Sequence, residues 1–445
     1  MLTFLGRQSR YCDGISRRNF LHIGGLALGG IALPDLLRAE ASSGVGRSEK
    51  AIIMIYLPGG PPHQDMWDIK TNAPSEMRGE FQPISTNVSG IQIGDQFPRM
   101  ASMMDKFAII RSMVGAKDRH ASHQCMTGRL SDNVPPSGWP EMGAVLSKLK
   151  GPTHPSIPPY INMAARMKHT PYNSGYPGFL GQSHAAFQPH NEGKADMVLN
   201  GVTLDRLSDR RTLLDTMDAI RRRVDAVGLP QNTDGFTEQA FGVLTSGRLL
   251  EALDVEREDP KTRERYGKGT GKVQGDAAPR LNEQFLIARR LVEAGARCVT
   301  VSYSFWDWHG NNFKRGRENM PDLDQALTAL VTDLHERGLD QDVSVVAWGE
   351  FGRSPRINKD AGRDHWPQVS CAALACGGMR TGQIIGSTNR LGEYAHERPV
   401  NFQEVFATLY HNLGIDINRA TVADLNGRPR YLVDHDEFQP LPELC

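Results

Sequence analysis

The sequence lacks an excess of charge of either sign, because its 445 residues include 51 Lys and Arg against 51 Asp and Glu. A balanced charge gives no electrostatic reason to expect binding to nucleic acid or to an anionic membrane surface. Beyond residue 41 no apolar run reaches the length of a membrane span, so we expect no stable membrane span in the mature protein. Haem, iron–sulfur and dinucleotide motifs are also missing, which makes redox chemistry the weakest alternative.

Cysteine is scarce, with only six in the chain. Cys12 precedes the expected start of the mature protein, so the mature protein has an odd number of cysteines. The spacing of the others matches neither a zinc knuckle nor a disulfide scaffold. A bridge between two of them, Cys371 and Cys376, is one alternative, and buried thiols are the other. The remaining cysteines are Cys125, Cys298 and Cys445.

The N-terminal region has the three parts of a twin-arginine signal peptide, in the correct order. Residues 16–21 read Ser-Arg-Arg-Asn-Phe-Leu, an apolar stretch covers 23–33, and Ala-Glu-Ala follows at 39–41. The alternative is a chance Arg-Arg pair before a buried helix. We expect a signal peptide at 1–41, a mature chain beginning near Ser42, and passage through the twin-arginine translocase to the periplasm or the extracellular space.

Short apolar runs alternate with helical patterns along most of the chain. Such alternation is typical of a mostly parallel central sheet with helices on both faces, an α/β/α sandwich. Pro321 is expected to open one of the helices and Gly338 to close it. The expected strands cover 51–57, 107–110, 298–303 and 343–348, and the expected helices 281–296, 322–337 and 402–413.

The middle of the chain differs in composition. Loops rich in Pro, Gly and His cover 152–191, and an arginine-rich amphipathic helix is expected at about 204–227. We interpret 150–280 as an insertion or cap on a domain that spans 48–440.

Side chains that bind metals follow the ends of the expected strands. In open α/β sheets, ligands bind outside the carboxyl ends of the strands. Imidazole and carboxylate groups suit divalent cations, so we expect one or two ions, with Zn, Mn, Ca and Fe all open. Taken singly, each cluster is also compatible with a polar turn or with stacked aromatic side chains. The candidate ligands are His63, Asp65, Asp307, His309, Glu350, Asp364 and His365, with His120 nearby.

Two arginines accompany these clusters, Arg353 and Arg363. A guanidinium group binds an anion through two parallel hydrogen bonds. Metals lower the pKa of a bound water, and arginines stabilise non-bridging oxygens. The combination indicates metal-assisted cleavage of an anionic ester.

Four segments resemble the DUF1501 family, a twin-arginine-exported family of the alkaline phosphatase-like superfamily, which also includes sulfatases and phosphoglycerate mutases. The resemblance implies an alkaline phosphatase-like α/β fold and covers nearly all of the mature chain. The segments are Gly-Gly-Pro-Pro-His-Gln-Asp (59–65), Trp-Asp-Trp-His-Gly-Asn-Asn (306–312), Gly-Glu-Phe-Gly-Arg-Ser-Pro (349–355) and Gly-Arg-Asp-His-Trp-Pro (362–367).

The resemblance also implies roles for the candidate ligands. Asp65, with His63, would be the carboxylate after the first strand, and Asp307 with His309 would form the pair of one metal site. Glu350 stands where the superfamily has Asp-His or Asp-Asn. His365 would be the late histidine ligand, with Asp364 beside it.

The usual nucleophile of sulfatases is absent. Thr127-Gly128-Arg129 matches the Thr-Gly-Arg that follows that nucleophile, but the corresponding earlier positions read Asp118-Arg119-His120. Three alternatives remain: attack by a metal-activated water, a covalent or ligand role for His120, or loss of hydrolysis.

Two functions therefore compete. The first is an exported metal-dependent hydrolase that cleaves a sulfate or phosphate ester, with a sulfated polysaccharide as one candidate substrate. The second is a non-catalytic metal- or glycan-binding module that keeps the fold.

Overall fold

The computed structural model describes residues 49–132, 134–189 and 247–445. The chain divides into two units, Met1–Glu49 and Lys50–Cys445, and the description below concerns the second. The expected twin-arginine signal and the expected helix at 204–227 lie outside the described residues.

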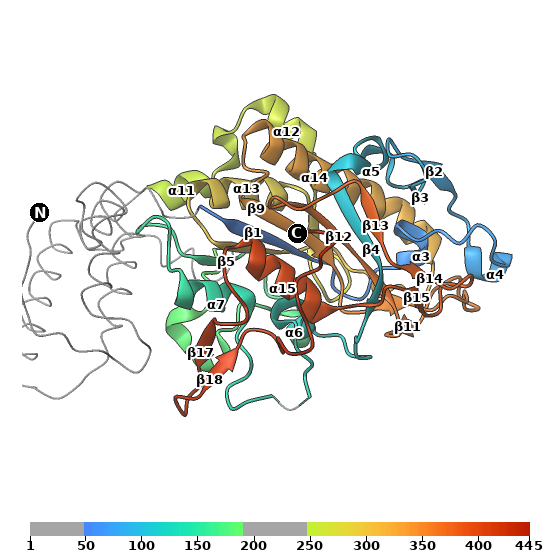
Figure 1. Ribbon diagram of the computed structural model, residues 1–445. Coiled ribbons are helices and arrows are strands. Elements are labelled where there is room, and N and C mark those ends of the chain that lie inside the picture. The colour runs from blue at the N-terminus through green and yellow to red at the C-terminus, as the bar shows by residue number, and fades with distance from the viewer. Residues whose placement is uncertain (1–48, 133, 190–246) are drawn as a thin grey trace, which may run out of the picture. The chain divides into compact units, whose positions relative to one another are not determined.

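A large sheet forms the centre of this unit, with strand order β13-β4-β12-β9-β1-β8-β5 and with β16 beside β4 (Figure 1). Every residue of β1 and β9 is buried, because both faces of these central strands are covered. This explains their continuous apolar sequences. The strands are β1 (Ala51–Tyr56), β4 (Phe107–Val114), β5 (Tyr160–Asn162), β8 (Cys298–Ser302), β9 (Val343–Trp348), β12 (Ser370–Cys376), β13 (Gln383–Ile385) and β16 (Val400–Asn401).

The sheet is mostly parallel. Strand β1 pairs in parallel with β8 and β9, and β4 pairs in parallel with β13 and β16. Among the described strands of this sheet, only β12 runs the other way, antiparallel to both β4 and β9. The predicted α/β class with a mostly parallel central sheet is therefore confirmed.

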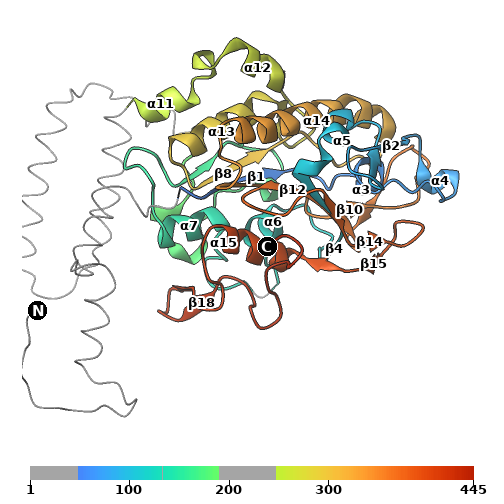
Figure 2. The same cartoon turned by 45° about the horizontal axis from the view of Figure 1, so that its top comes forward.

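Helices cover both faces of the sheet (Figure 2). Ile53 and Ile55 of β1 face a core that includes α5, α13 and α14, whereas Ile52 and Met54 face a core that includes α6, α7 and α15. Each fully buried aliphatic side chain contributes roughly 1.5–3 kcal/mol. These helices are α5 (Pro98–Ser102), α6 (His123–Thr127), α7 (Met142–Leu149), α13 (Glu283–Ala294), α14 (Asn312–Glu336) and α15 (Phe402–Asn412).

Shorter elements lie around these layers. The short α-helices are α3 (His63–Met66), α4 (Ser75–Arg78), α11 (Arg248–Leu253) and α12 (Pro260–Tyr266). The 3-10 helices are η1 (Met104–Lys106), η2 (Thr170–Tyr172), η3 (Gly178–Leu180), η4 (Gln182–His184) and η5 (Val255–Arg257). The two-stranded ribbons pair β2 (Pro83–Ser85) with β3 (Gln92–Gly94), β6 (Gly269–Val273) with β7 (Pro279–Leu281), β10 (Gly352–Arg353) with β11 (His365–Trp366), β14 (Ser387–Thr388) with β15 (Ala395–Glu397), and β17 (Thr421–Ala423) with β18 (Pro429–Tyr431).

The expected start of one helix is wrong. Pro321 does not open a helix but lies inside α14, which already begins at Asn312. The turns before the proline are held by packing, since the rings of Phe313 and Phe81 lie 5.5 Å apart and Met320 is buried. Tertiary contacts therefore outweigh the loss of one helical hydrogen bond at the proline.

Described parts of the region 150–280 belong to the main unit. β5 is an edge strand of the central sheet, paired with β8. α11 packs on α13, and α12 packs on α14. The boundaries expected for an insertion or cap stay a prediction.

The described cysteines are free thiols, and four of the five are buried. Cys371 and Cys376 lie on the same strand, β12, where five residue-to-residue steps of extended chain separate them by about 16 Å. They cannot bridge, so the alternative of buried thiols is correct.

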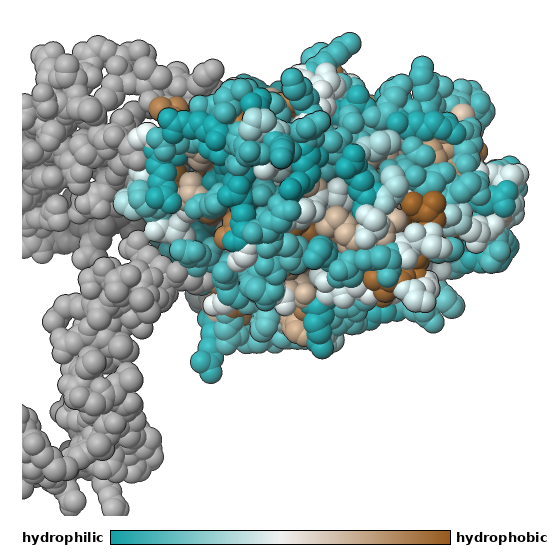
Figure 3. Space-filling model, turned by 90° about the horizontal axis from the view of Figure 1, so that it is seen from above, coloured by the Kyte–Doolittle hydropathy of each residue, from teal (hydrophilic) through white to brown (hydrophobic). Residues whose placement is uncertain are grey.

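Among the described residues, no helix has the length and apolarity needed to cross a membrane. The face drawn in Figure 3 is mainly hydrophilic, with small separate apolar groups.

Candidate metal centre

The loops that follow three parallel strands meet at one end of the sheet. β4 leads into the loop that carries His120, β8 into the loop with Asp307 and His309, and β9 into Glu350. The short ribbon of β10 and β11 adds His365, which is paired in register with Arg353. In Figure 1, α3 and β11, which follow β1 and β9 in the chain, lie toward this same end.

Four of the predicted site residues come together: His120, Asp307, His309 and His365. One ligand atom from each lies within 4.8 Å of the others. Nε2 of His309 lies 3.1 Å from Nε2 of His365 and 2.9 Å from Oδ1 of Asp307. Nε2 of His120 lies 3.3 Å from Oδ2 of Asp307.

These separations fit a divalent cation. With metal–nitrogen bonds of about 2.0–2.1 Å, the ligand atoms of a tetrahedral zinc site lie about 3.3 Å from one another. The distances of 2.9–3.3 Å from Asp307 to the three imidazole rings are close to that edge length. Nε2 of His120 is buried, and among the described residues it has only the 3.3 Å contact with Oδ2 of Asp307, without a well-formed hydrogen bond, as expected of an atom that a cation would satisfy.

A separate carboxylate holds each of the three imidazole rings through Nδ1. The distances are 3.0 Å from His120 to Glu350, 2.9 Å from His309 to Asp364 and 2.6 Å from His365 to Asp118. When Nδ1–H donates to a carboxylate, the lone pair of Nε2 is left for a metal. Metal-binding histidines almost always have such a partner.

The charges within the centre support one another. Burial raises the pKa of Asp307, but hydrogen bonds from His120, His365 and Arg353 outweigh it and hold that pKa well below its usual range. Burial lowers the pKa of His120, but its contacts with Asp307 and Glu350 raise that pKa to about 9. Positive charge is therefore favoured among these carboxylates, whether a proton or a cation supplies it.

Two glycines allow the loops of the centre to approach closely. Gly59 has φ +108°, and a Cβ atom there would lie 2.4 Å from the backbone nitrogen of Asp307. A Cβ atom at Gly362 would lie 2.0 Å from the carbonyl oxygen of His309. Since both contacts involve backbone, a side chain at either position would displace a loop that carries a ligand.

Arg353 and Arg363 act inside the protein. Arg353 is buried and donates to the carbonyls of Gly59, Gly60 and Arg363 and to Oδ1 of Asp307. Arg363 is fully buried and donates to both oxygens of Asp65, at 2.7 and 2.9 Å. Its other donors go to the carbonyls of Ser354, Pro355 and Met77. Because all five N–H groups of Arg363 are used, the predicted role of this arginine in holding a substrate anion needs correction: it fixes the loops instead.

Asp65 and His63 are not part of the group of four. Asp65 is fully buried, and besides Arg363 its carboxylate accepts a hydrogen bond from Nδ2 of Asn312 at 2.8 Å. Nδ1 of His63 accepts the backbone N–H of Arg353 at 3.4 Å. Burial and the nearby Arg363 lower the pKa of His63 to about 3, so this ring is neutral. Both side chains link α3 to the loops that support the centre.

Asp118 was not among the predicted site residues, although it holds His365. The sequence carries a signal for it, because Asp118-Arg119-His120 has the same Asp-x-His spacing as Asp307-Trp308-His309. The aromatic surroundings of His120 were also missed. Its ring lies 5.4 Å from the ring of Tyr172 and 5.1 Å from that of Phe351.

The family model described as "Protein of unknown function (DUF1501)" matches residues 49–444. The chain belongs to the DUF1501 family. No curated protein matches this DUF1501 chain. The family resemblance suggested by its motifs is thereby confirmed.

Several solved structures resemble the DUF1501 chain at low identity. The PsFucS1 sulfatase from Pseudoalteromonas sp. has 13% identity and a TM-score of 0.38, with 89% of this chain and 75% of that one covered. The lipoteichoic acid synthase LtaP from Listeria monocytogenes has 11% identity and a TM-score of 0.36, over 83% of this chain and 73% of that one. The TAB5 alkaline phosphatase has 9% identity and a TM-score of 0.32, over 83% and 99%.

Proposed function

We propose that this DUF1501 chain is an exported metal-dependent hydrolase that cleaves a sulfate or phosphate ester. One observation carries the proposal: three imidazole Nε2 atoms and the Asp307 carboxylate converge, and each imidazole is oriented by its own carboxylate. Such a set holds a cation in a defined geometry.

The donor set narrows the choice of metal. Three nitrogen donors and one carboxylate suit Zn, Mn or Fe, whereas Ca prefers six to eight oxygen donors. When bound, such a cation would supply Lewis acidity, which activates water and screens the charge of an anionic ester. His120, Asp307, His309 and His365 would hold it.

The side chains of the centre suggest where the substrate enters. The His309 side chain is 48% exposed, whereas Glu350 behind His120 is 2% exposed. An ester would therefore approach from the side of His309. Arg353 keeps Asp307 ionised and in place from the buried side.

The attacking oxygen comes from water in this proposal. The ring of His120 is itself a member of the group of four, so it would be occupied as a ligand. Thr127 and Arg129 do not supply a nucleophile or an anion site either. The Thr127 hydroxyl donates to the carbonyl of His123 at 2.7 Å, and Arg129 pairs with Asp434 at 2.7 Å.

A non-catalytic metal- or glycan-binding module is the second candidate. It is favoured by the number of ligands, because four protein ligands complete a tetrahedron, as in structural zinc sites, whereas catalytic sites keep a position open.

Export remains part of the proposal in either case. The Arg-Arg motif, apolar stretch and Ala-Glu-Ala site of the first 41 residues support passage to the periplasm or beyond.

The test is turnover of para-nitrophenyl sulfate and para-nitrophenyl phosphate by protein loaded with Zn, Mn or Fe. We expect turnover of at least one ester, its loss on treatment with a chelator, and its loss in His309→Ala together with bound metal. His396→Ala, which changes an exposed histidine of β15 outside the group, is the matched control and should keep both. Tight metal binding without turnover of either ester would favour the binding module.

A further inference from the structure

A recess opens beside the metal centre, within the segment that leads from β4 into α6 and just beyond. Its lining includes Lys117, Arg119, His123, Ser131 and Glu350, and the space within it and at its mouth, open solvent included, is about 270 Å³. We call it the 117–131 recess. Neither the proposed metal centre nor the core uses this space.

The recess and the metal centre share one side chain. Oε1 of Glu350 contacts Nδ1 of His120, whose Nε2 belongs to the group of four. Oε2 of the same carboxylate is buried and makes no well-formed hydrogen bond with any described residue. The imidazole ring of His120 therefore lies between the metal centre and the recess.

The inner part of the recess offers hydrogen-bond acceptors to a ligand that carries donors. Besides Oε2 of Glu350, Nε2 of His123 is buried without a hydrogen-bond partner. The ring of His123 also interacts with the backbone of Leu130, and burial lowers the pKa of this ring, so it is neutral. If Nδ1–H makes that backbone contact, Nε2 is an acceptor. The buried phenol of Tyr56 interacts with the same carboxylate, although the two groups make no well-formed hydrogen bond, so a donor from a ligand would compete with this phenol for Glu350. Unpaired buried polar atoms of this kind are costly unless a ligand or water satisfies them.

The outer part of the recess carries two cationic side chains, which suit a ligand with an anionic acceptor group. Arg119 makes no ion pair among the described residues, and its Nη1 donates to the hydroxyl of Ser131 at 3.4 Å. The Lys117 side chain is 48% exposed and pairs with the equally exposed Asp132 at 2.9 Å. Both cations can therefore turn to an anionic group at little cost, because exposed ion pairs contribute about 1 kcal/mol or less.

We infer that the 117–131 recess binds an acidic saccharide unit of the substrate. A sugar hydroxyl would enter it and donate to Glu350 and His123, and an anionic substituent would remain at the rim with Lys117 and Arg119. A ligand that joins hydroxyl donors to a negative group matches both parts at once. The inference rests on the proposed function, because it assigns the substrate of the neighbouring centre to anionic glycans.

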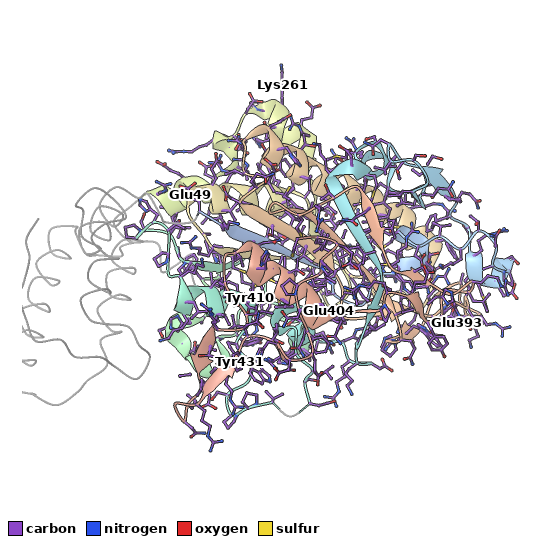
Figure 4. The ribbon with its side chains drawn as sticks, in the orientation of Figure 1. Glu49, Lys261, Glu393, Glu404, Tyr410 and Tyr431 are labelled. Carbon is purple, nitrogen blue, oxygen red and sulfur yellow. The ribbon has the colours of Figure 1, made fainter. Side chains whose placement is uncertain are left out.

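The experiment compares the metal-loaded wild type with Lys117→Ala/Arg119→Ala and with His123→Leu. The probes are sulfated tetrasaccharides from a galactan, a fucan and heparin, the same sugars after removal of sulfate, and para-nitrophenyl sulfate. Dissociation constants come from titration calorimetry and KM values from turnover. Lys261→Ala/Arg419→Ala is the matched control, because Lys261 projects from α12 into solvent (Figure 4) and Arg419 is 89% exposed. Thermal unfolding confirms that each variant is folded.

We expect at least one sulfated tetrasaccharide to bind, and to bind about tenfold more weakly in each recess variant, as the loss of a hydrogen bond predicts. Its desulfated form should bind more weakly and be insensitive to the double variant. In Lys117→Ala/Arg119→Ala, KM for para-nitrophenyl sulfate should rise less than KM for the tetrasaccharide, since this small ester carries no sugar.

Three outcomes would overturn the inference: no binding of any sulfated tetrasaccharide, equal binding by the double variant and its control, or unchanged binding in His123→Leu, which would leave the recess to ordered water. Failure of the proposed function is distinguishable. In that case no ester is turned over, yet the tetrasaccharide still binds and still depends on the recess.

Discussion

Oε1 of Glu350 lies 3.0 Å from Nδ1 of His120 and accepts the backbone N–H of Gly59 at 2.9 Å. One buried carboxylate thus joins the loops that follow β4, β1 and β9. It orients an imidazole of the candidate metal centre without being one of the four convergent ligands.

Glu350→Gln should therefore lower metal affinity without removing a ligand. Loss of the carboxylate that orients a metal-binding histidine typically costs 10- to 100-fold in affinity, and we expect a loss of about that size. Competition with a chromophoric chelator measures it. The matched control is Glu437→Gln, an exposed glutamate near the C-terminus, and it should leave the affinity unchanged. Equal affinities in the two variants would contradict the orienting role.

The carboxylates of Asp118 and Asp364 should contribute less to metal affinity than that of Glu350. The side chains of Asp118 and Asp364 are 61% and 57% exposed, so water and salt weaken their hold on His365 and His309. We expect Asp118→Asn and Asp364→Asn each to lower metal affinity by less than about tenfold, and the double variant by more. Asp360→Asn is the control, since Asp360 is exposed beside the same loop. A larger loss in Asp118→Asn than in Glu350→Gln would reverse this order.

Asp65 and Arg363 should contribute to stability more than to metal binding. Both side chains are fully buried, and two hydrogen bonds join them. Removing one partner of such a pair leaves a buried charge and costs about 3–5 kcal/mol. We expect Asp65→Ala to lower the free energy of unfolding in urea by about that amount, and Asp65→Leu/Arg363→Met to recover part of it. A loss of metal affinity in folded Asp65→Ala as large as that in His309→Ala would instead support the ligand role predicted from the sequence.

The sequence predicts the sheet better than the centre, for a physical reason. The strands β1, β8 and β9 are buried on both faces, so their apolar runs are readable without knowledge of their partners. The choice between ligand and ion pair is not local. Asp65 faces Arg363 across 298 positions of the chain, and nothing near Asp65 reveals this.

The same limit applies to the carboxylates behind the histidines. Strand ends predicted that His309 and His365 would meet, because the carboxyl ends of parallel strands share one edge of the sheet. Which acid orients which ring depends on loop paths. Asp118 precedes His120 by two positions but holds His365, whereas His120 is held by Glu350.

Gly362→Ala should disturb the centre through steric overlap alone. The φ angle of Gly362 is not among the positive values, but a Cβ atom there would lie 2.0 Å from the carbonyl oxygen of His309. We expect metal affinity to fall at least about tenfold as the His309 loop moves, which corresponds to about 1.4 kcal/mol. Gly310→Ala is a close control, because its Cβ atom would meet nothing nearer than 3.5 Å. Similar affinities in the two variants would show that the loop adapts.

Glu141 is not one of the candidate metal ligands, and it should make the free energy of unfolding depend on pH. This carboxyl group is buried and accepts hydrogen bonds from the hydroxyl of Tyr160 and from the backbone N–H of Gly175. Burial raises the pKa of Glu141 to about 7, although these hydrogen bonds lower it. In an unfolded chain a glutamate titrates near about 4.3. Between the two values, the folded protein keeps a proton that the unfolded chain has released.

The free energy of unfolding should therefore fall as the pH rises from about 4.3 to 7, by at most roughly 3 kcal/mol from this group. Glu141→Gln cannot ionise and should flatten the dependence in that window, so the variant gains relative stability as the pH rises. Urea unfolding at several pH values between 4.5 and 7.5 measures both curves, with Glu437→Gln as the control for an exposed glutamate. Parallel curves for wild type and Glu141→Gln would mean that Glu141 ionises in the folded protein as readily as in the unfolded chain.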